Sequence, residues 1–207
     1  MTLRDSFVYP HGDPSVSLFN QAVQRWDLAL PAGAKVLELG CCETDFAKWF
    51  KQARPDVMLI GCDVNVGADA HYDVFLHQGA ESLPMGKGEF DAVIALGSLE
   101  HFGLGFYGDA INANADVETI ANIERWLKPG GWCYYDVPWT PETHYVTGNR
   151  HFRVYDDTTL QTRLHGGLIP KARAFASGDR DVWQDERPAA PMVPFWYAIQ
   201  LLEKAVN

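Results

Sequence analysis

One stretch of this 207-residue chain, residues 34–50, constrains the fold more than any other segment. It reads AKVLELGCCETDFAKWF. An apolar run predicts a buried strand, Gly40 begins a turn, and an amphipathic pattern from Phe46 predicts a helix. Strand, tight turn and helix in this order are typical of the first unit of a nucleotide-binding α/β sheet, whose ligands lie at the carboxyl ends of the strands. We therefore expect residues 39–44 to contact a cofactor.

The rest of the chain alternates predicted strands with predicted helices. Apolar runs indicate strands at residues 57–62, 74–78, 90–96, 132–137 and 171–176, and apolar faces indicate helices at 14–30, 116–127, 157–164 and 195–205. This order predicts an α/β fold with a doubly wound, mostly parallel Rossmann-like sheet and helices on both faces. We expect a single domain over residues 1–207, with an N-terminal helical cap (1–33), a cofactor-binding core (34–178) and a C-terminal tail and helix (179–207).

The charge balance argues against a nucleic-acid substrate. The chain has 17 Lys and Arg against 27 Asp and Glu, a net charge of −10, and no basic run to contact phosphates. Its four cysteines form no C-x-x-C pair, which favours reduced, buried thiols. No segment has the roughly 20 apolar residues of a membrane span or the apolar core of a signal peptide. We expect a cytoplasmic protein without membrane contacts, and the oligomeric state, a homodimer included, stays open.

The first turn favours a cofactor that carries positive charge. Cys42 and Thr44 stand where a dinucleotide fingerprint would have its second and third glycines, and Glu38 and Glu43 flank the turn. A pyrophosphate needs close backbone approach and is repelled by carboxylates, so a nicotinamide-dependent oxidoreductase is disfavoured. Asp63 ends the second strand, where an acid accepts hydrogen bonds from the ribose of an adenosine. An adenosine with an ammonium and a sulfonium, S-adenosylmethionine, fits these residues.

The motifs VLELG, GCD, HQGAESLP, FDAVIALGSLEH and LKPGG, in this order over residues 34–137, resemble those of class I S-adenosylmethionine-dependent methyltransferases. The segment FRVYDDTTL at residues 152–160 extends the similarity. Within that superfamily, SLEHFGLGFYGD at residues 98–109 resembles a group of uncharacterised methyltransferase-like proteins with an SLEH-x-GLG-x-YGD motif.

The resemblance implies a set of cofactor contacts. Glu38 and Gly40 are expected at the methionine part, Asp63 at the ribose, and Ala80 and Glu81 at the adenine. The remaining expected contacts follow the first, second and fourth strands: Cys41, Cys42, Val64, Gly97, Ser98 and Leu99. The departures at Cys42 and Thr44 keep open an alternative, a catalytically silent domain that binds the cofactor, its product S-adenosylhomocysteine, or a partner.

His101 is our first candidate for the general base. It follows the fourth strand, beside the expected methyl group, and an imidazole has an ordinary pKa of about 6.5, close to working pH. A histidine that only bonds to the backbone at a helix start is the alternative. Asp136 at the end of the fifth strand, and His144 and His151 in the segment after it, are the reserve candidates.

Two subclasses fit less well. Methyltransferases of DNA bases or glutamine carry an acid or Asn, Pro-Pro and an aromatic residue after the fourth strand, unlike residues 95–98 here. The segment GGWCYYDVPW resembles part of the metal-dependent catechol-type enzymes, but the acid after the fourth strand is missing and Val137 replaces the expected Asn. A hard cation needs several oxygen ligands, so we predict that no metal takes part.

The acceptor pocket is expected from three variable segments, residues 102–109, 139–153 and 181–197. Glycines at 103, 105 and 108 make the first of them a candidate lid. The segments supply aromatic side chains suited to a sugar ring or planar metabolite: Phe106, Tyr107, Trp139, Tyr145, Trp183, Phe195, Trp196 and Tyr197. The sequence thus predicts methyl transfer from S-adenosylmethionine to a small-molecule or sugar acceptor, at a hydroxyl.

Overall fold

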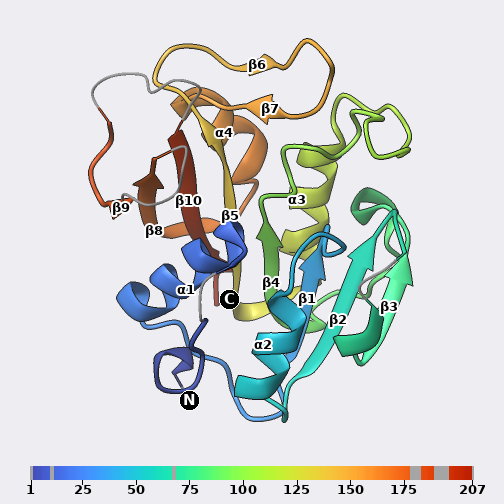
Figure 1. The fold of residues 1–207 in the computed structure, drawn as a ribbon, viewed down its shortest axis with the longest axis vertical. Helices are drawn as coiled ribbons and strands as arrows, with labels where there is room; N and C mark the ends of the chain where they lie inside the picture. Colours follow the sequence, from blue (N-terminus) through green and yellow to red (C-terminus); the bar gives the residue numbers. More distant parts are fainter. Residues whose placement is uncertain (1, 10–11, 67–68, 178–182, 189–195, 207) are drawn as a thin grey trace.

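The computed structural model describes residues 2–9, 12–66, 69–177, 183–188 and 196–206, and its centre is an eight-stranded sheet (Figure 1). The strand order is β3-β2-β1-β4-β5-β10-β8-β9. The strands are β1 (Lys35–Leu39), β2 (Met58–Asp63), β3 (Val74–His77), β4 (Phe90–Leu96), β5 (Leu127–Trp139), β8 (Ile169–Ala176), β9 (Trp183–Gln184) and β10 (Trp196–Glu203). A separate hairpin pairs β6 (Tyr145–Val146) with β7 (Arg153–Val154).

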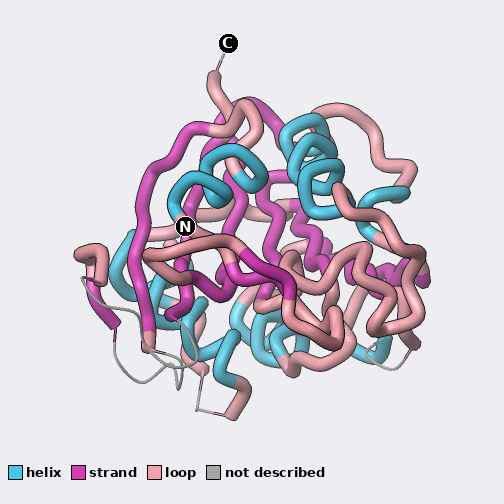
Figure 2. Tube along the Cα trace, turned by 90° about the horizontal axis from the view of Figure 1, so that it is seen from above, coloured by secondary structure: helices cyan, strands magenta, loops and turns pink. Residues whose placement is uncertain are grey.

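Helices cover both faces of the sheet, as Figure 2 shows from above. The α-helices are α1 (Pro14–Trp26), α2 (Phe46–Ala53), α3 (Ala115–Trp126) and α4 (Asp157–Leu164). Short 3-10 turns lie at Leu3–Asp5, Asp69–His71 and Ala80–Ser82. Apolar side chains of α1 and α2 form one buried cluster with one face of the sheet, and those of α3 and α4 form a second cluster with the other face. The predicted doubly wound fold is confirmed.

The sheet has a point at which the winding reverses. β1 pairs in parallel with β2 on one side and β4 on the other, and β3 and β5 continue the parallel pairing outward. β10 runs antiparallel between β5 and β8. In open α/β sheets the crevice for a ligand lies outside the carboxyl ends of the strands at such a reversal, here between β1 and β4.

The predicted helix at residues 195–205 is wrong, because Trp196–Glu203 is the strand β10. Phe195 lies outside the described residues. Residues 196–202 are all buried, since β10 is an inner strand with β5 and β8 on its two sides and core clusters on both faces. A short run that is apolar all round has neither the period of a strand nor that of a helix, so its pattern did not distinguish the two.

The start of α1 is as predicted, and its end is not. The Asp13 carboxylate accepts hydrogen bonds from the Ser15 and Val16 amides, and Pro14 occupies the first helical position. The helix ends at Trp26 instead of residue 30, because Asp27 adopts a left-handed conformation with φ of 55°. None of the described helices combines the length and apolar character needed to cross a membrane.

Candidate active site

A cavity of about 340 Å³ lies at the carboxyl ends of β1, β2 and β4. Eleven of its lining residues come from the first turn, the end of β2 and the segments after β2 and β3: Gly40, Glu43, Thr44, Cys62, Asp63, Val64, Asn65, Gln78, Gly79, Ala80 and Glu81. The others are Asp13, Ser15, Leu96, Gly97, Ser98, Glu100, His101, Phe102, Gly103, Tyr107, Asp109, Pro138, His151, Phe152 and Tyr197. The predicted cofactor turn and the predicted base therefore face one space.

Gly40 lets the first turn approach the end of β4. Its φ is +67°, and a Cβ atom at this position would lie 2.5 Å from the Cβ of Ser98, closer than carbon atoms pack. The Ser98 hydroxyl donates a hydrogen bond of 2.8 Å to the Leu39 carbonyl, which fixes the two segments together. This contact leaves the backbone of Gly40 open to the cavity, as a closely held cofactor requires.

Asp63 is held at the edge of the cavity by backbone amides. Its two carboxylate oxygens accept hydrogen bonds from the Cys42 amide at 2.9 Å and from the Asn65 amide at 2.8 Å. Each oxygen keeps a second lone pair for another donor. Cys42 also donates from its thiol to the Asn65 carbonyl. The residue that replaces the second glycine therefore joins the first turn to Asp63 and the loop after it.

Glu38 lies beneath the turn and does not line the cavity. It is fully buried and accepts hydrogen bonds from the Thr44 hydroxyl at 2.9 Å and the Tyr72 hydroxyl at 2.6 Å. Burial raises the pKa of its carboxyl to about 8, although both donors oppose this shift. Thr44, which replaces the third glycine, thus supports the buried acid and lines the cavity itself. Glu38, predicted at the methionine part of a cofactor, therefore does not reach the cavity, whereas its hydrogen-bond partner Thr44 does.

The other predicted cofactor residues divide between the cavity wall and the core. Val64, Ala80, Glu81 and Gly97 line the cavity, whereas the fully buried Leu99 does not. Cys41 is also buried away from the cavity.

His101 and His151 lie together on the cavity wall, with ring centroids 5.0 Å apart. The Nδ1 atom of His101 lies 2.6 Å from the His151 carbonyl oxygen, which only accepts, so Nδ1 carries the hydrogen and Nε2 has the free lone pair. Burial lowers the pKa of His101, and burial and the neighbouring ring lower that of His151. Both imidazoles are neutral at pH 7, as a base requires.

Aromatic side chains of the loop after β4 complete this end of the cavity. Phe106 stacks on the ring of His151 with centroids 4.1 Å apart, and the edge of Tyr107 meets His101 at 5.2 Å. The Tyr107 hydroxyl lies 3.4 Å from Nε2 of His151. Burial is the main cause that raises the pKa of Tyr107, and the Glu43 carboxylate across the turn adds to it.

A family comparison agrees with this geometry. The family model of the methyltransferase domain matches residues 17–189, which is most of the chain. The chain belongs to the methyltransferase domain family. The family uses S-adenosylmethionine as its methyl donor, which confirms the predicted cofactor and the assignment as an enzyme. No curated protein sequence matches the chain significantly. That the chain belongs to the narrower group with the SLEH-x-GLG-x-YGD motif stays a prediction.

Solved structures share the fold at low identity. The 1,6-didemethyltoxoflavin-N1-methyltransferase of Burkholderia thailandensis, with 1,6-didemethyltoxoflavin and S-adenosylhomocysteine bound, is 18% identical with a TM-score of 0.61, covering 93% of this chain and 77% of that chain. The [4+2]-cyclase SpnF is 20% identical with a TM-score of 0.66, covering 86% and 78%. The N-methyltransferase NodS of Bradyrhizobium japonicum WM9 is 13% identical with a TM-score of 0.55, covering 92% and 94%. These likenesses show the fold and leave the acceptor open.

Two reserve candidates lie apart from the histidine pair of this methyltransferase-domain chain. Asp136 is fully buried in β5, where it pairs with Leu96 of β4 and Ile199 of β10, and it does not line the cavity. His144 also lies outside the cavity wall, with its ring 5.3 Å from that of Tyr155. Of the four candidates for the base, the structure brings only His101 and His151 together.

The acceptor segments contribute unequally. Of the aromatic residues predicted for the acceptor pocket, Tyr107 and Tyr197 line the cavity. Phe106 does not line it but stacks on His151, which does. The remaining described ones do not line it: Trp139, Tyr145, Trp183 and Trp196. Within the described residues, no group of three or more His, Cys, Asp or Glu side chains is arranged to hold a metal ion. The predicted absence of a metal stays a prediction.

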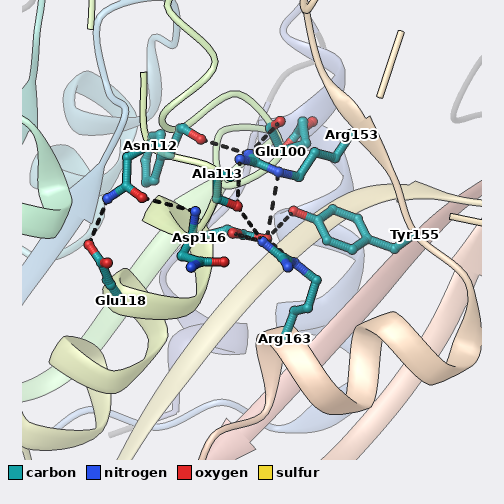
Figure 3. Close-up of polar contacts among 10 residues, drawn as sticks. Glu100, Asn112, Ala113, Asp116, Glu118, Arg153, Tyr155 and Arg163 are labelled. Atoms are coloured by element: carbon teal, nitrogen blue, oxygen red, sulfur yellow. Dashed lines mark hydrogen bonds and ion pairs between the residues drawn. The ribbon is translucent and has the colours of Figure 1, made fainter. Parts of the chain in front are cut away.

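A buried ionic network that the sequence did not predict fixes the loop after β4 (Figure 3). Arg153 is 2% exposed and donates from its backbone amide to the Glu100 carbonyl at 2.9 Å and from its guanidinium to the Phe102 carbonyl at 2.6 Å. Asp116 of α3 lies 3.8 Å from Arg153 and accepts from Arg163 at 2.6 and 2.9 Å. Glu100 and Phe102, whose carbonyls accept these two hydrogen bonds, directly precede and follow His101 in the sequence. The sequence features that could have predicted this network are the charged residues within FRVYDDTTL and at the start of α3.

Proposed function

We propose that this protein transfers the methyl group of S-adenosylmethionine to a hydroxyl of a small acceptor, with a sugar or glycan intermediate favoured. The observation that carries the proposal is that one cavity has the cofactor turn and Asp63 at one end and the neutral His101–His151 pair at the other. When bound, the cofactor supplies a methyl group already activated by its sulfonium, so the protein has to align the acceptor and accept its proton.

The cofactor end fits an adenosine with a methionine chain. Asp63 has lone pairs for the ribose hydroxyls, and the backbone of Gly40 permits close approach. Ala80 and Glu81 offer backbone and side-chain contacts to the adenine at the far end. These fits support the predicted roles of the lining residues.

At the acceptor end, Nε2 of His101 is the atom that receives the proton. The His151 carbonyl orients the ring by holding Nδ1–H, which leaves the lone pair on Nε2. Phe106, Tyr107 and Phe152 surround the two imidazoles with aromatic rings. Such a wall over polar groups suits a ring-shaped acceptor.

Other properties of the proposed enzyme rest on its charge and thiols. The described lining residues include no Lys or Arg, which supports a small molecule in place of a nucleic acid. None of the four cysteines forms a disulfide, and three of them are buried, which supports a cytoplasmic enzyme. The alternative function is a catalytically silent domain, which would bind the cofactor at the same end of the cavity but would not transfer its methyl group.

The test is transfer of a labelled methyl group from S-adenosylmethionine into a deproteinised metabolite extract. The proposal expects label in a small-molecule product with the wild-type protein, and a loss of at least about 100-fold with His101→Ala. The control is Glu142→Ala, an exposed acid that does not line the cavity. His101→Ala activity near the wild-type level would remove His101 as the base. Cofactor binding with no labelled product would favour the silent domain.

A further inference from the structure

The backbone around His101 is held by a residue from a distant part of the chain. Residues 98–104 belong to no helix or strand and form successive turns, in which the His101 amide donates to the Ser98 carbonyl at 3.0 Å and the His101 carbonyl accepts from the Leu104 amide at 3.3 Å. The carbonyls on either side of His101, those of Glu100 and Phe102, accept hydrogen bonds from outside these turns.

Arg153 of β7 supplies these donors (Figure 3). Its amide donates to the Glu100 carbonyl at 2.9 Å, and its Nη1 atom lies 2.6 Å from the Phe102 carbonyl oxygen and 3.4 Å from that of Glu100. Its Nη2 atom lies 3.5 Å from the Ala113 carbonyl oxygen. The residue is 2% exposed, so water does not compete for these hydrogen bonds. One buried residue thus fixes the peptide groups on both sides of His101.

The segment that carries Arg153 also orients the ring of His101. The His151 carbonyl, two residues before Arg153, accepts the hydrogen bond from Nδ1 of His101. The His151 amide is itself held by the Thr147 hydroxyl at 3.0 Å and the Asn149 side chain at 3.1 Å. Residues 151–153 therefore fix both the ring and the backbone of His101. A shift of the backbone relative to this segment would break the bond to Nδ1 and free the ring to change its tautomer.

Arg153 also acts on His101 through its charge. Burial lowers the pKa of His101 and Arg153 lowers it further, whereas the His151 carbonyl, Glu43 and Asp109 raise it. The titratable groups that face the ring come from the first turn, the loop after β4 and the β6–β7 hairpin: Glu43, Glu100, Tyr107, Asp109, His151 and Arg153. Within this set, only Arg153 is a permanent cation.

We propose that Arg153 is a positioning residue for methyl transfer, which holds the backbone of residues 100–102 so that His101 keeps its bond to the His151 carbonyl and presents Nε2 to the acceptor. The proposal rests on the proposed function, because it takes His101 as the base. It assigns a part in the reaction to a residue that does not line the cavity. A merely structural residue would change the stability and leave the ring of His101 as it is.

The test follows the imidazole nitrogens of His101 by NMR in protein saturated with S-adenosylhomocysteine, which needs no acceptor. The wild type should show hydrogen on Nδ1 and a bare Nε2. Arg153→Met fills much of the same space without donors, so we expect a mixture of the two tautomers. The titration midpoint of His101 should rise by about half a pH unit, because a positive charge has gone. Arg153→Lys restores the charge and a donor and should recover part of both changes.

The rate of labelled-methyl transfer is the second readout. Arg153→Met should lower kcat at least about 10-fold, because a misplaced base costs rate, while the KM for S-adenosylmethionine stays near that of the wild type. The pH–rate profile of the variant should shift upward with the NMR midpoint of His101.

Arg163→Met is the matched control, since Arg163 belongs to the same buried network but bonds to Asp116 and the Ala113 carbonyl. It should lower the unfolding temperature as Arg153→Met does and keep the wild-type tautomer and midpoint of His101. A wild-type tautomer and midpoint in Arg153→Met, or equal changes in Arg163→Met, would overturn the proposal.

S-adenosylhomocysteine binding and the unfolding temperature show whether Arg153→Met is folded. If it is not, Arg153→Lys takes its place: mixed tautomers support the proposal, and a wild-type ring with wild-type kcat overturns it. An absence of labelled product from the wild-type protein would instead refute the proposed function, while the tautomer of His101 in the variants still shows whether Arg153 holds the ring.

Discussion

At the residue scale, Glu38 links the cofactor turn to the pH dependence of folding. Its carboxyl has a pKa of about 8 in the folded protein because it is buried, against an ordinary value of 4.5. Between these values the folded chain binds a proton that the unfolded chain has lost. The contribution of Glu38 to the free energy of unfolding therefore falls as the pH rises from about 4.5 to about 8.

Glu38→Gln should remove this pH dependence. A glutamine cannot ionise, and its amide oxygen can still accept a hydrogen bond from Thr44 or Tyr72. Thermal unfolding between pH 5 and pH 8.5 should show the wild type losing up to a few kcal/mol relative to the variant. Parallel curves for the two proteins would contradict the buried, protonated state. Glu142→Gln, at an exposed position, should follow the wild type.

The rate of methyl transfer should fall at acidic pH. Burial and Arg153 lower the pKa of His101, while the His151 carbonyl, Glu43 and Asp109 raise it, and the net direction is downward. Because only the neutral imidazole accepts a proton, kcat should reach its plateau by about pH 7 and decline below the pKa. A pH–rate profile under saturating cofactor measures this. A rate that still rises above pH 8 would point to another group as the base.

At the scale of elements, the ionic network is a stability determinant of the loop after β4. Asp116 is fully buried and holds Arg163 and the Tyr155 hydroxyl, beside the nearly buried Arg153. Asp116→Asn leaves the charge of Arg153 buried without its carboxylate, so we expect a loss of about 3 kcal/mol in urea unfolding.

Glu118→Gln is the control for this prediction, since Glu118 lies on the same helix and makes one exposed hydrogen bond to Asn112. It should change the free energy of unfolding by less than about 0.5 kcal/mol. A loss for Asp116→Asn no larger than that of the control would show that the network does not stabilise the loop.

Local patterns predicted the elements whose sequence has a period or a terminal signal. β1, β4 and α2 follow from their apolar patterns, and the start of α1 follows from Asp13. β10 was missed because its side chains are buried on both faces, a property that depends on its neighbours in the sheet. The Asp116 network was missed for the same reason, since it joins residues far apart in the chain.

More residues of the proposed cofactor end of the cavity than of its proposed acceptor end could be predicted from the sequence. Residues such as Gly40 and Asp63 directly follow or end strands, so the topology alone brings them to the cavity. The pairing of His101 with His151 depends on how the β6–β7 hairpin returns to the loop after β4, which no local pattern encodes. Asp136 was predicted at the end of the fifth strand, but β5 continues to Trp139, so Asp136 lies inside the sheet with a fully buried side chain.

At the scale of the whole molecule, the reversal between β1 and β4 places two chemically different halves in one cavity. β1 and β2 carry the cofactor turn and Asp63, and β4 leads into the loop that holds His101, Tyr107 and Asp109. The chain has a net charge of −10, and the cavity has the same sign of charge. Six acids line it, and its described lining residues include no Lys or Arg. That distribution favours a cofactor with an ammonium and a sulfonium over one with phosphates.

The most direct test of this account is calorimetric titration of the intact protein with S-adenosylhomocysteine. We predict one site per chain with a micromolar or tighter dissociation constant. Asp63→Ala should weaken binding by at least about 100-fold, because the ribose hydroxyls lose their charged acceptor. Glu142→Ala should bind like the wild type. An absence of binding to the wild-type protein, or an unchanged affinity in Asp63→Ala, would contradict the assignment of the cavity as the cofactor site.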